Sequence, residues 1–338
     1  MRKGIIGAGN WILDKIKIID WWPGEGNLCS ITQQLDSPGG GPCNVLFDIA
    51  AIDPAVPLYA AGRLGDDAEG KVLLDAMKKH NIDSGCITFS KSASTSFTDV
   101  MSGNGKRTFF HCRGANAEFS PDDLMQIDVP AKFFYLGYLL LLDSFDKIEE
   151  STGKPAACRA LAAMRSKGYK TIVDFVSDAP ERFRSVVAPT LPEIDILIVN
   201  EIEAQACTGI TLRNGDGSLN TAGLPDAVDK LLEMGVRETV VIHFPEGAVG
   251  KERGGEYICT PSCHIELADI VGSTGAGDAF AAGTIYALHE NWELEKAMRF
   301  GSASSFFNLK SATATEGAVS REVMLKHLEN CEFNPLPR

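Results

Sequence analysis

Short runs of β-forming residues alternate with amphipathic helical stretches over nearly the whole chain. Such alternation builds a parallel sheet, because each connection between parallel strands needs a helix that packs on one face of the sheet. The sequence therefore predicts an α/β fold with a doubly wound, mostly parallel sheet and helices on both faces. The expected strands are Gly4–Ala8, Pro57–Ala61, Lys132–Gly137, Thr171–Phe175, Ile194–Val199 and Thr239–Phe244, and the expected helices are Asp66–His80, Pro155–Lys167, Pro225–Met234, Gly277–Glu290 and Leu294–Phe307.

Two segments, 11–38 and 93–113, interrupt this alternation, because they contain β-forming runs with no helix between them. The second segment contains Gly103-Asn104-Gly105, and Asn-Gly between two such runs is a strong hairpin signal. Segments of this kind commonly form a small antiparallel sheet that covers a site at the C-terminal edge of the main sheet. We expect one domain over residues 1–338 with this β-sheet lid inserted; the alternative is that both segments are surface hairpins without a function.

Charge and cysteine content exclude several classes of protein. The net charge of -13 argues against nucleic acid or an anionic membrane as a partner, because like charges repel. No apolar run reaches the ~18 residues that cross a bilayer. Nine scattered cysteines, without a secretory signal, indicate reduced thiols and a cytoplasmic protein. Cys259, Cys263 and His264 lie close together, but no second pair of ligands follows at a zinc-finger distance, so the sequence does not predict a structural metal site.

Residues 272–283 form a glycine-rich loop that leads into a helix of small residues. Glycines permit close approach of the backbone, and the amides at a helix N-terminus attract a phosphate group. Asp278 lies inside this turn, where a carboxylate weakens anion binding. Its position is useful if it removes a proton from an attacking hydroxyl. The alternative is an acidic residue that only interacts with the helix dipole.

The residues from Thr274 to Phe280, with a glycine three positions further on, resemble the C-terminal signature of the ribokinase-like (PfkB) family of sugar and nucleoside kinases. Other motifs of that family follow the same order in this chain. They are Pro38-Gly39-Gly40-Gly41 with Asn44, Gly62-Arg63-Leu64-Gly65-Asp66-Asp67 with Gly70, and Asn200-Glu201-Ile202-Glu203. The similarity spans residues 3 to 320, and it implies the ribokinase-like fold.

The resemblance implies roles for the residues of these motifs. Asp278 is the expected general base, and its loop is expected to form an anion hole from the backbone of Gly275, Ala276 and Gly277. The expected acceptor site consists of Asp14, Gly40, Gly41 and Asn44. Short polar side chains and bare backbone suit a polyol, because carboxylate and amide oxygens accept hydrogen bonds from its hydroxyls. The alternative for the three successive glycines is a flexible turn.

The resemblance also implies that the chain binds ATP and Mg²⁺. Asn200 and Glu203 stand three residues apart at the start of a helix, and they are expected to organise Mg²⁺ through water. The same pair can form a capping box at the helix N-terminus, and the two interpretations are compatible. The remaining expected nucleotide contacts are Thr274, His243 and Gly247.

Three positions depart from the family pattern. Gly272 stands where the family usually has an aspartate that helps to hold a monovalent cation, so the sequence argues against potassium activation. Asp174-Phe175-Val176 lacks an asparagine that the family has after this strand. His243-Phe244-Pro245 replaces a Thr-x-Gly stretch that contacts phosphate, which calls ordinary nucleotide affinity into question.

These features predict an ATP-dependent kinase that phosphorylates a hydroxyl of a small sugar. Two alternatives stay open. A nucleoside kinase needs an aromatic-walled pocket, for which Phe97 and Phe109 are candidates. A non-catalytic sensor of sugar or nucleotide is compatible with the changed stretch at His243. An exposed strand edge in the lid favours a homodimer that forms through the lid. The sequence does not identify the acceptor.

Overall fold

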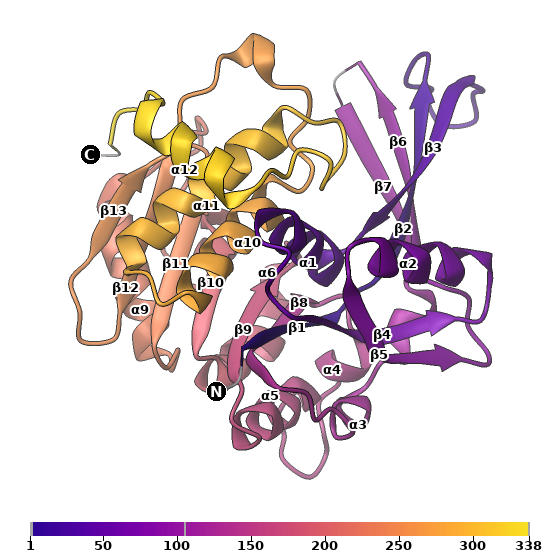
Figure 1. Ribbon diagram of the computed structural model, residues 1–338, viewed down its shortest axis with the longest axis horizontal. Coiled ribbons are helices and arrows are strands. Elements are labelled where there is room, and N and C mark those ends of the chain that lie inside the picture. Colours follow the sequence, from indigo (N-terminus) through magenta and orange to yellow (C-terminus); the bar gives the residue numbers. More distant parts are fainter. Residues whose placement is uncertain (1–2, 105, 337–338) are drawn as a thin grey trace.

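The computed structural model describes residues 3–104 and 106–336. Its largest element is a nine-stranded sheet with the order β13-β12-β11-β10-β9-β8-β1-β4-β5 (Figure 1). Neighbouring strands pair in parallel, except that β12 is antiparallel to both β11 and β13. The strands are β1 (Gly4–Gly9), β4 (Leu58–Gly65), β5 (Ile82–Ser90), β8 (Ala131–Leu139), β9 (Lys170–Phe175), β10 (Ile196–Asn200), β11 (Thr239–Phe244), β12 (Gly247–Glu252) and β13 (Ile258–Pro261). This arrangement confirms the predicted mostly parallel sheet.

Helices cover both faces of this sheet, and the sheet divides the core into two apolar clusters. Successive residues of a strand point to opposite faces, so Ile5 belongs to one cluster and Ile6 to the other. The cluster with Ile5 is completed by α1 (Gly41–Ile52), α2 (Ala68–Lys79), α10 (Ala276–His289), α11 (Leu294–Leu309) and α12 (Arg321–Asn330). The cluster with Ile6 is completed by α5 (Ala156–Ser166), α8 (Glu201–Thr208) and α9 (Leu224–Glu233). The short helices are α3 (Pro121–Leu124), α4 (Asp143–Asp146), α6 (Pro180–Arg182) and α7 (Ala188–Thr190).

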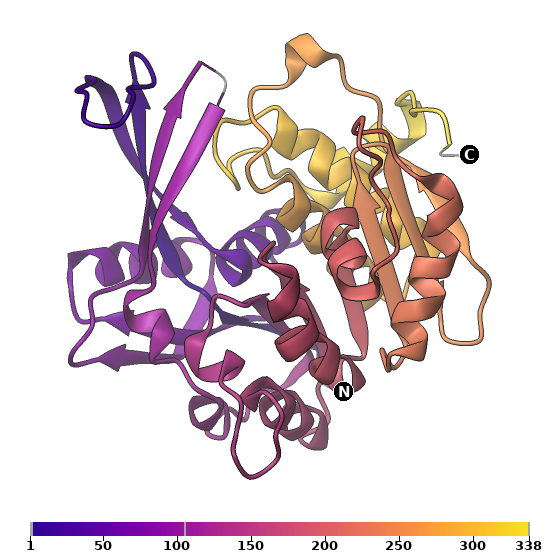
Figure 2. The same ribbon diagram turned by 180° about the vertical axis from the view of Figure 1, so that it is seen from behind.

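A separate four-stranded sheet projects beyond the main sheet, as both views show (Figures 1 and 2). It has the order β3-β2-β6-β7 and consists of β2 (Ile12–Ile19), β3 (Ile31–Gly39), β6 (Phe97–Gly103) and β7 (Lys106–Cys112). These strands come from the two segments that the sequence assigned to a lid. The hairpin between β6 and β7 is confirmed, with Gly103 opposite Lys106 and Asn104 at a φ of 51°; Gly105 lies outside the described residues.

The expectation that the lid is entirely antiparallel was wrong, because β2 and β6 pair in parallel. The reason lies in the main sheet. Strand β2 follows β1 and β6 follows β5, and both β1 and β5 belong to the parallel part of that sheet. The chain therefore leaves the same edge of the main sheet twice in the same direction.

Every expected strand and helix is present, with ends that differ by a few residues, but α1 was not predicted. Its side chains from Gly41 to Ile49 are all buried, because the helix contacts β1, β8 and α10. A helix that is buried on every side has no polar face and therefore no amphipathic period to reveal it. No helix within residues 3–104 and 106–336 is long and apolar enough to span a membrane.

Candidate active site

A cavity of about 250 Å³ lies where β8, β9, β10 and β11 end and α10 begins. The carboxyl ends of parallel strands are the usual ligand-binding edge of an open α/β sheet, because the loops that follow the strands can diverge there. The lining residues are Tyr138, Asp174, Phe175, Val176, Ser177, Asn200, Glu203, His243, Gly275, Gly277 and Asp278.

Asp278 lies in the first turn of α10 with only 6% of its surface exposed. Its Oδ2 accepts hydrogen bonds from Asn44 Nδ2 and from the Tyr138 hydroxyl, each at 2.8 Å. Within the described residues no donor bonds Oδ1, so this oxygen is the one available to a bound hydroxyl. Burial raises the pKa of Asp278 to about 6, and the two hydrogen bonds act in the opposite direction. A carboxyl group with this pKa is ionised at neutral pH and can still take up a proton.

Of the four residues expected to bind the acceptor, Asn44 contacts Asp278 directly, and none of the four lines the cavity itself. Burial raises the pKa of Asp14 to about 7, the Thr98 hydrogen bond lowers it, and the charge of Asp278 raises it further. Asn44 is buried, and within residues 3–104 and 106–336 its Oδ1 has no hydrogen-bond partner. A buried amide oxygen without a partner is unfavourable, so it is suited to accept a hydrogen bond from a ligand.

Gly40 and Gly41 connect the lid strand β3 with α1 and leave no space for side chains. Gly40 has a φ of 94°, and a Cβ atom on it would lie 2.0 Å from the carbonyl oxygen of Asn10. A Cβ atom on Gly41 would lie 3.0 Å from Cδ1 of Tyr138. The tight turn brings Asn44 into the first turns of α1, where it reaches Asp278.

Asn200 and Glu203 form the capping box at the start of α8. Asn200 Oδ1 accepts from the Glu203 amide at 2.9 Å, and Glu203 Oε2 accepts from the Asn200 amide at 3.1 Å. Both residues also line the cavity, so the capping interpretation and the ligand-binding interpretation fit the same geometry. Burial raises the pKa of Glu203 to about 7, although hydrogen bonds to Asn200 and Ser177 lower it.

Asp174 joins Glu203 and Asp278 as a third buried carboxyl group at the cavity. Burial raises its pKa well above the ordinary value, and the charges of Glu203 and Asp278 act in the same direction. Tyr135 donates a hydrogen bond to Asp174 Oδ2 at 3.0 Å. Three acidic groups that oppose one another's ionisation fit a hard divalent cation such as Mg²⁺, which prefers oxygen ligands and retains much of its water. No ligand role was predicted for Asp174, although an acid at the end of a buried strand is a usable signal.

The glycine-rich loop packs tightly between His243 of β11 and Ala314, which follows α11. A Cβ atom on Gly277 would lie 3.2 Å from Cε1 of His243, and one on Gly275, which has a φ of 80°, would lie 2.7 Å from Cβ of Ala314. His243 stacks on Phe280 with 5.0 Å between the ring centroids. Burial lowers the pKa of His243 to about 4, so this side chain is neutral at physiological pH. The Ala276 amide donates a turn hydrogen bond of 3.3 Å to the carbonyl oxygen of Ser273. In general, the amides in the first turn of a helix have no acceptor within the helix itself.

Two expected nucleotide contacts do not line the cavity. Gly247 begins β12, and a Cβ atom on it would lie 2.2 Å from the carbonyl oxygen of Thr260, so strand packing explains the glycine. Thr274 immediately precedes the lining residue Gly275.

Tyr138 is a site residue that the sequence did not indicate. It has a φ of 63°, and Nδ2 of the Asn10 side chain donates a hydrogen bond of 3.0 Å to its carbonyl oxygen. Non-glycine residues with such backbone angles are strained and concentrate at functional sites. In the sequence Tyr138 is only one more apolar residue at the end of a buried strand.

A larger depression of about 480 Å³ lies near the opposite edge of the sheet, between α9 and β12. Its lining includes Asp229 and Lys251, which form an ion pair of 2.7 Å, and the turn at Arg253 and Gly254. It shares no residue with the motifs above, so we place the candidate site in the cavity at Asp278.

Comparisons with known proteins agree with this geometry. The family model described as "pfkB family carbohydrate kinase" matches residues 16–320. A probable fructokinase-2 of Arabidopsis thaliana is 25% identical over 299 residues, which cover 85% of each chain. A 5-dehydro-2-deoxygluconokinase of Clostridium perfringens is 23% identical over 305 residues, which cover 86% of this chain and 83% of the relative. The solved Arabidopsis thaliana ribokinase complexed with ribose and ATP superimposes with a TM-score of 0.77 at 23% identity, covering 98% of this chain and all of the other, which shows a shared fold.

Proposed function

The chain belongs to the pfkB family of carbohydrate kinases, and we propose that it transfers the γ-phosphate of ATP to a hydroxyl of a small sugar with Asp278 as the general base. The observation that carries this proposal is the position of Asp278: its carboxyl group lines the cavity at the N-terminus of α10 and is bonded by Asn44. A proton acceptor and an anion-binding helix end therefore meet at one point.

In the proposed reaction, the acceptor hydroxyl lies against Oδ1 of Asp278. Asp278 takes the hydroxyl proton while the oxygen forms a bond to the γ-phosphorus and the bond from that phosphorus to the β-phosphate oxygen breaks, which releases ADP. The amides of Gly275 and Gly277, and that of Ala276 once it releases its 3.3 Å turn bond to Ser273, donate to the oxygens of the transferred group. The pKa of about 6 lets Asp278 return its proton to solvent after each turnover.

Glu203 and Asp174, with the Asn200 amide group, are the residues suited to hold Mg²⁺, partly through water. When bound, the ion supplies positive charge beside the phosphates of ATP. The mutual repulsion of the buried carboxyl groups supports this assignment, because a cation would relieve it. Neutral His243 lies next to Gly277 and contributes shape, not charge, to the proposed phosphate site.

The acceptor is proposed to bind between Asp14 and Asn44, with its reactive hydroxyl toward Asp278. The raised pKa of Asp14 and the partnerless Oδ1 of Asn44 support a ligand that supplies hydroxyl donors to both. The lid reaches the segment that packs on the glycine-rich loop, because Arg107 of β7 donates to the carbonyl oxygen of Ala312 at 3.3 Å and Ala314 packs against Gly275. A lid over the site excludes water that would otherwise accept the phosphate.

The nucleoside alternative named Phe97 and Phe109 as candidate walls of the acceptor pocket. Phe109 is 57% exposed on the lid, and neither it nor Phe97 lines the cavity. The exposed rings of Phe109 and Phe110 on β7 do support the proposal that the lid forms a homodimer, since such rings usually become covered in an assembly.

The test is ATP consumption by the purified protein against a panel of sugars, sugar acids and nucleosides. We expect turnover that depends on a sugar and that falls about 1,000-fold in Asp278→Asn, while the variant still binds the sugar. Asp226→Asn, an exposed acid on α9, is the matched control and should keep full activity. Turnover only with nucleosides would favour that alternative, and binding without turnover in the unmodified protein would favour a sensor.

A further inference from the structure

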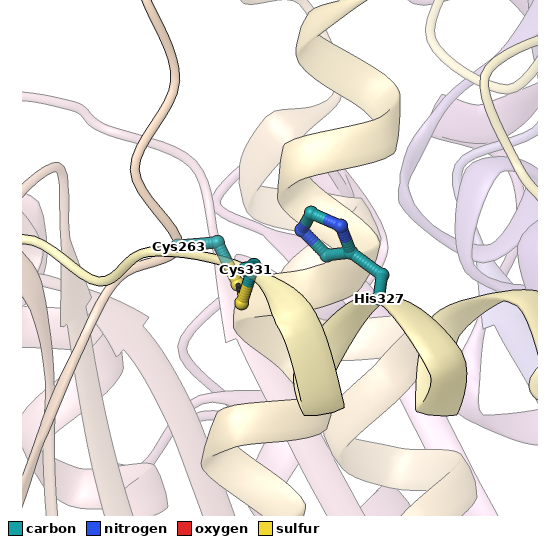
Figure 3. A group of neighbouring side chains, drawn as sticks. All are labelled: Cys263, His327 and Cys331. Carbon is teal, nitrogen blue, oxygen red and sulfur yellow. Dashed lines mark hydrogen bonds between the residues drawn. The ribbon is translucent and has the colours of Figure 1, made fainter.

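Three potential metal ligands, of which Cys263 is far from the other two in the sequence, meet beside α12 on the face of the main sheet that α11 covers (Figure 3). Cys263 follows β13, His327 lies in the last turn of α12, and Cys331 directly follows that helix. Their ligand atoms all lie within 4.8 Å of one another. The Cys331 amide still donates to the His327 carbonyl at 2.8 Å, so the two side chains share one face of the helical turn.

The distance between the two sulfur atoms fits a shared metal ion and not a disulfide. Cys263 Sγ and Cys331 Sγ lie 3.8 Å apart. Two sulfurs that each lie about 2.3 Å from one tetrahedral zinc ion are separated by about 3.8 Å, whereas a disulfide requires about 2.05 Å. An imidazole nitrogen on the same ion lies roughly 3.6 Å from each sulfur, so a small rotation of the His327 side chain completes the geometry.

His327 has a nitrogen that needs a partner. Its Nε2 is buried and, within the described residues, has no hydrogen-bond partner. Phe306 stacks on the ring with 4.0 Å between the ring centroids. The neutral imidazole is the form in which histidine binds metals.

We propose that Cys263, His327 and Cys331 bind one Zn²⁺ ion, with water as the fourth ligand. Both thiols lose their protons to solvent on binding, so two thiolates, a neutral imidazole and Zn²⁺ carry no net charge. A neutral group is tolerated in this partly buried, aromatic surrounding, where an isolated charge is costly.

The site would fasten the C-terminal helix to the chain that runs from β13 to the glycine-rich loop. Backbone contacts already align the two segments, because His264 donates to the carbonyl oxygen of Glu332 at 2.8 Å and Cys263 forms a bridge with Phe333. His264 itself is not a ligand: its Nδ1 lies 2.8 Å from Oδ1 of Asn334 at the surface. The proposed ligands therefore differ from the group that lies close together in the sequence, which is Cys259, Cys263 and His264.

The test is titration of the full-length protein with Co²⁺, after removal of metals with a chelator under a reducing agent. We expect one equivalent to bind with thiolate-to-cobalt charge-transfer bands and the visible bands of tetrahedral cobalt, and Zn²⁺ to displace it. Cys331→Ser and His327→Gln should each weaken binding at least about 100-fold. Cys259→Ser, a partly buried thiol on β13, is the matched control and should bind as the unmodified protein does.

A second measurement uses thermal stability in place of the cobalt spectrum. Zn²⁺ should raise the Tm of the unmodified protein and of Cys259→Ser by several degrees, because a ligand that binds only the folded state stabilises it, and it should leave Cys331→Ser unchanged. The proposal is overturned if cobalt gives no thiolate bands, if Cys331→Ser binds Co²⁺ as tightly as the control, or if the protein forms a Cys263–Cys331 disulfide in the presence of Zn²⁺ without reductant.

Discussion

Asn44 Nδ2 and Asp278 Oδ2, which lie far apart in the sequence, are joined by a hydrogen bond of 2.8 Å. The bond connects the first turns of α1 and α10. Each helix begins after a glycine in the left-handed region, Gly40 with a φ of 94° and Gly275 with a φ of 80°. The motif expected to bind the acceptor and the motif expected to bind phosphate are therefore held in contact by one amide group.

Replacing Asn44 by alanine should move the pH dependence of turnover. The Asn44 hydrogen bond lowers the pKa of Asp278, so its loss raises that pKa above about 6. Asp278 must be ionised to accept a proton, so the acidic limb of the rate profile should move to higher pH and the rate at pH 6 should fall more than the rate at pH 8. The measurement is kcat against pH. Asn214→Ala, at an exposed loop position, should leave the profile unchanged, and an equal loss of rate at every pH would contradict the assignment.

Replacing Asp278 by asparagine should stabilise the protein at high pH. The folded pKa of Asp278, about 6, is above its ordinary value of 3.8, so the native state binds the proton more tightly than the unfolded chain. The resulting stability is present below pH ~4 and is lost as pH rises through 6. At pH 8, Asp278→Asn should therefore increase the free energy of unfolding by on the order of 2 kcal/mol, and the gain should shrink toward pH 4.5. Urea unfolding at both pH values is the measurement; a variant less stable than the unmodified protein at pH 8 would refute the prediction.

The sequence predicted those parts of the site that depend on local chemistry. The glycine-rich loop indicated a phosphate site because glycine and helix-terminal amides have that property wherever they occur. Tyr138 could not be predicted in this way, because its role comes from a φ of 63° and from contact with Asp278, 140 positions away. The proposed zinc site could not be predicted for the same reason, since Cys263 meets Cys331 only through the packing of α12.

The fold was predictable where the sequence carries a local pattern. The expected strands are buried on both faces, as Ile5 and Ile6 in opposite clusters show, and they are visible in the chain as short runs of β-forming apolar residues. Helix α1 is buried on every side, so it was missed although it carries Asn44. The parallel pairing of β2 with β6 is a property of the main sheet's strand order and has no local signal.

Two glycines with positive φ allow the cost of backbone strain to be measured separately from the cost of a missing space for Cβ. Gly40 has a φ of 94° and its Cβ position lies 2.0 Å from a carbonyl oxygen, whereas Gly153 has a φ of 66° and nothing within 4 Å. Gly153→Ala should cost about 1 kcal/mol of unfolding free energy, because only the backbone angle is unfavourable. Gly40→Ala should cost about 3 kcal/mol or more and also abolish activity, because the turn that carries Asn44 must move. Equal effects of the two substitutions on urea unfolding would show that space at Gly40 is not limiting.

Replacing Glu203 by glutamine should change the requirement for Mg²⁺ without disturbing α8. A glutamine oxygen can still accept from the Asn200 amide, so the capping box at 3.1 Å persists and the Tm should change little. The lost negative charge should raise the Mg²⁺ concentration that gives half-maximal turnover by about 10-fold, while the KM for the sugar stays the same. Glu233→Gln, an exposed position on α9, should leave both values unchanged. If Glu203→Gln instead lowered turnover equally at all Mg²⁺ concentrations, its carboxylate would act in the reaction by a route other than holding the ion.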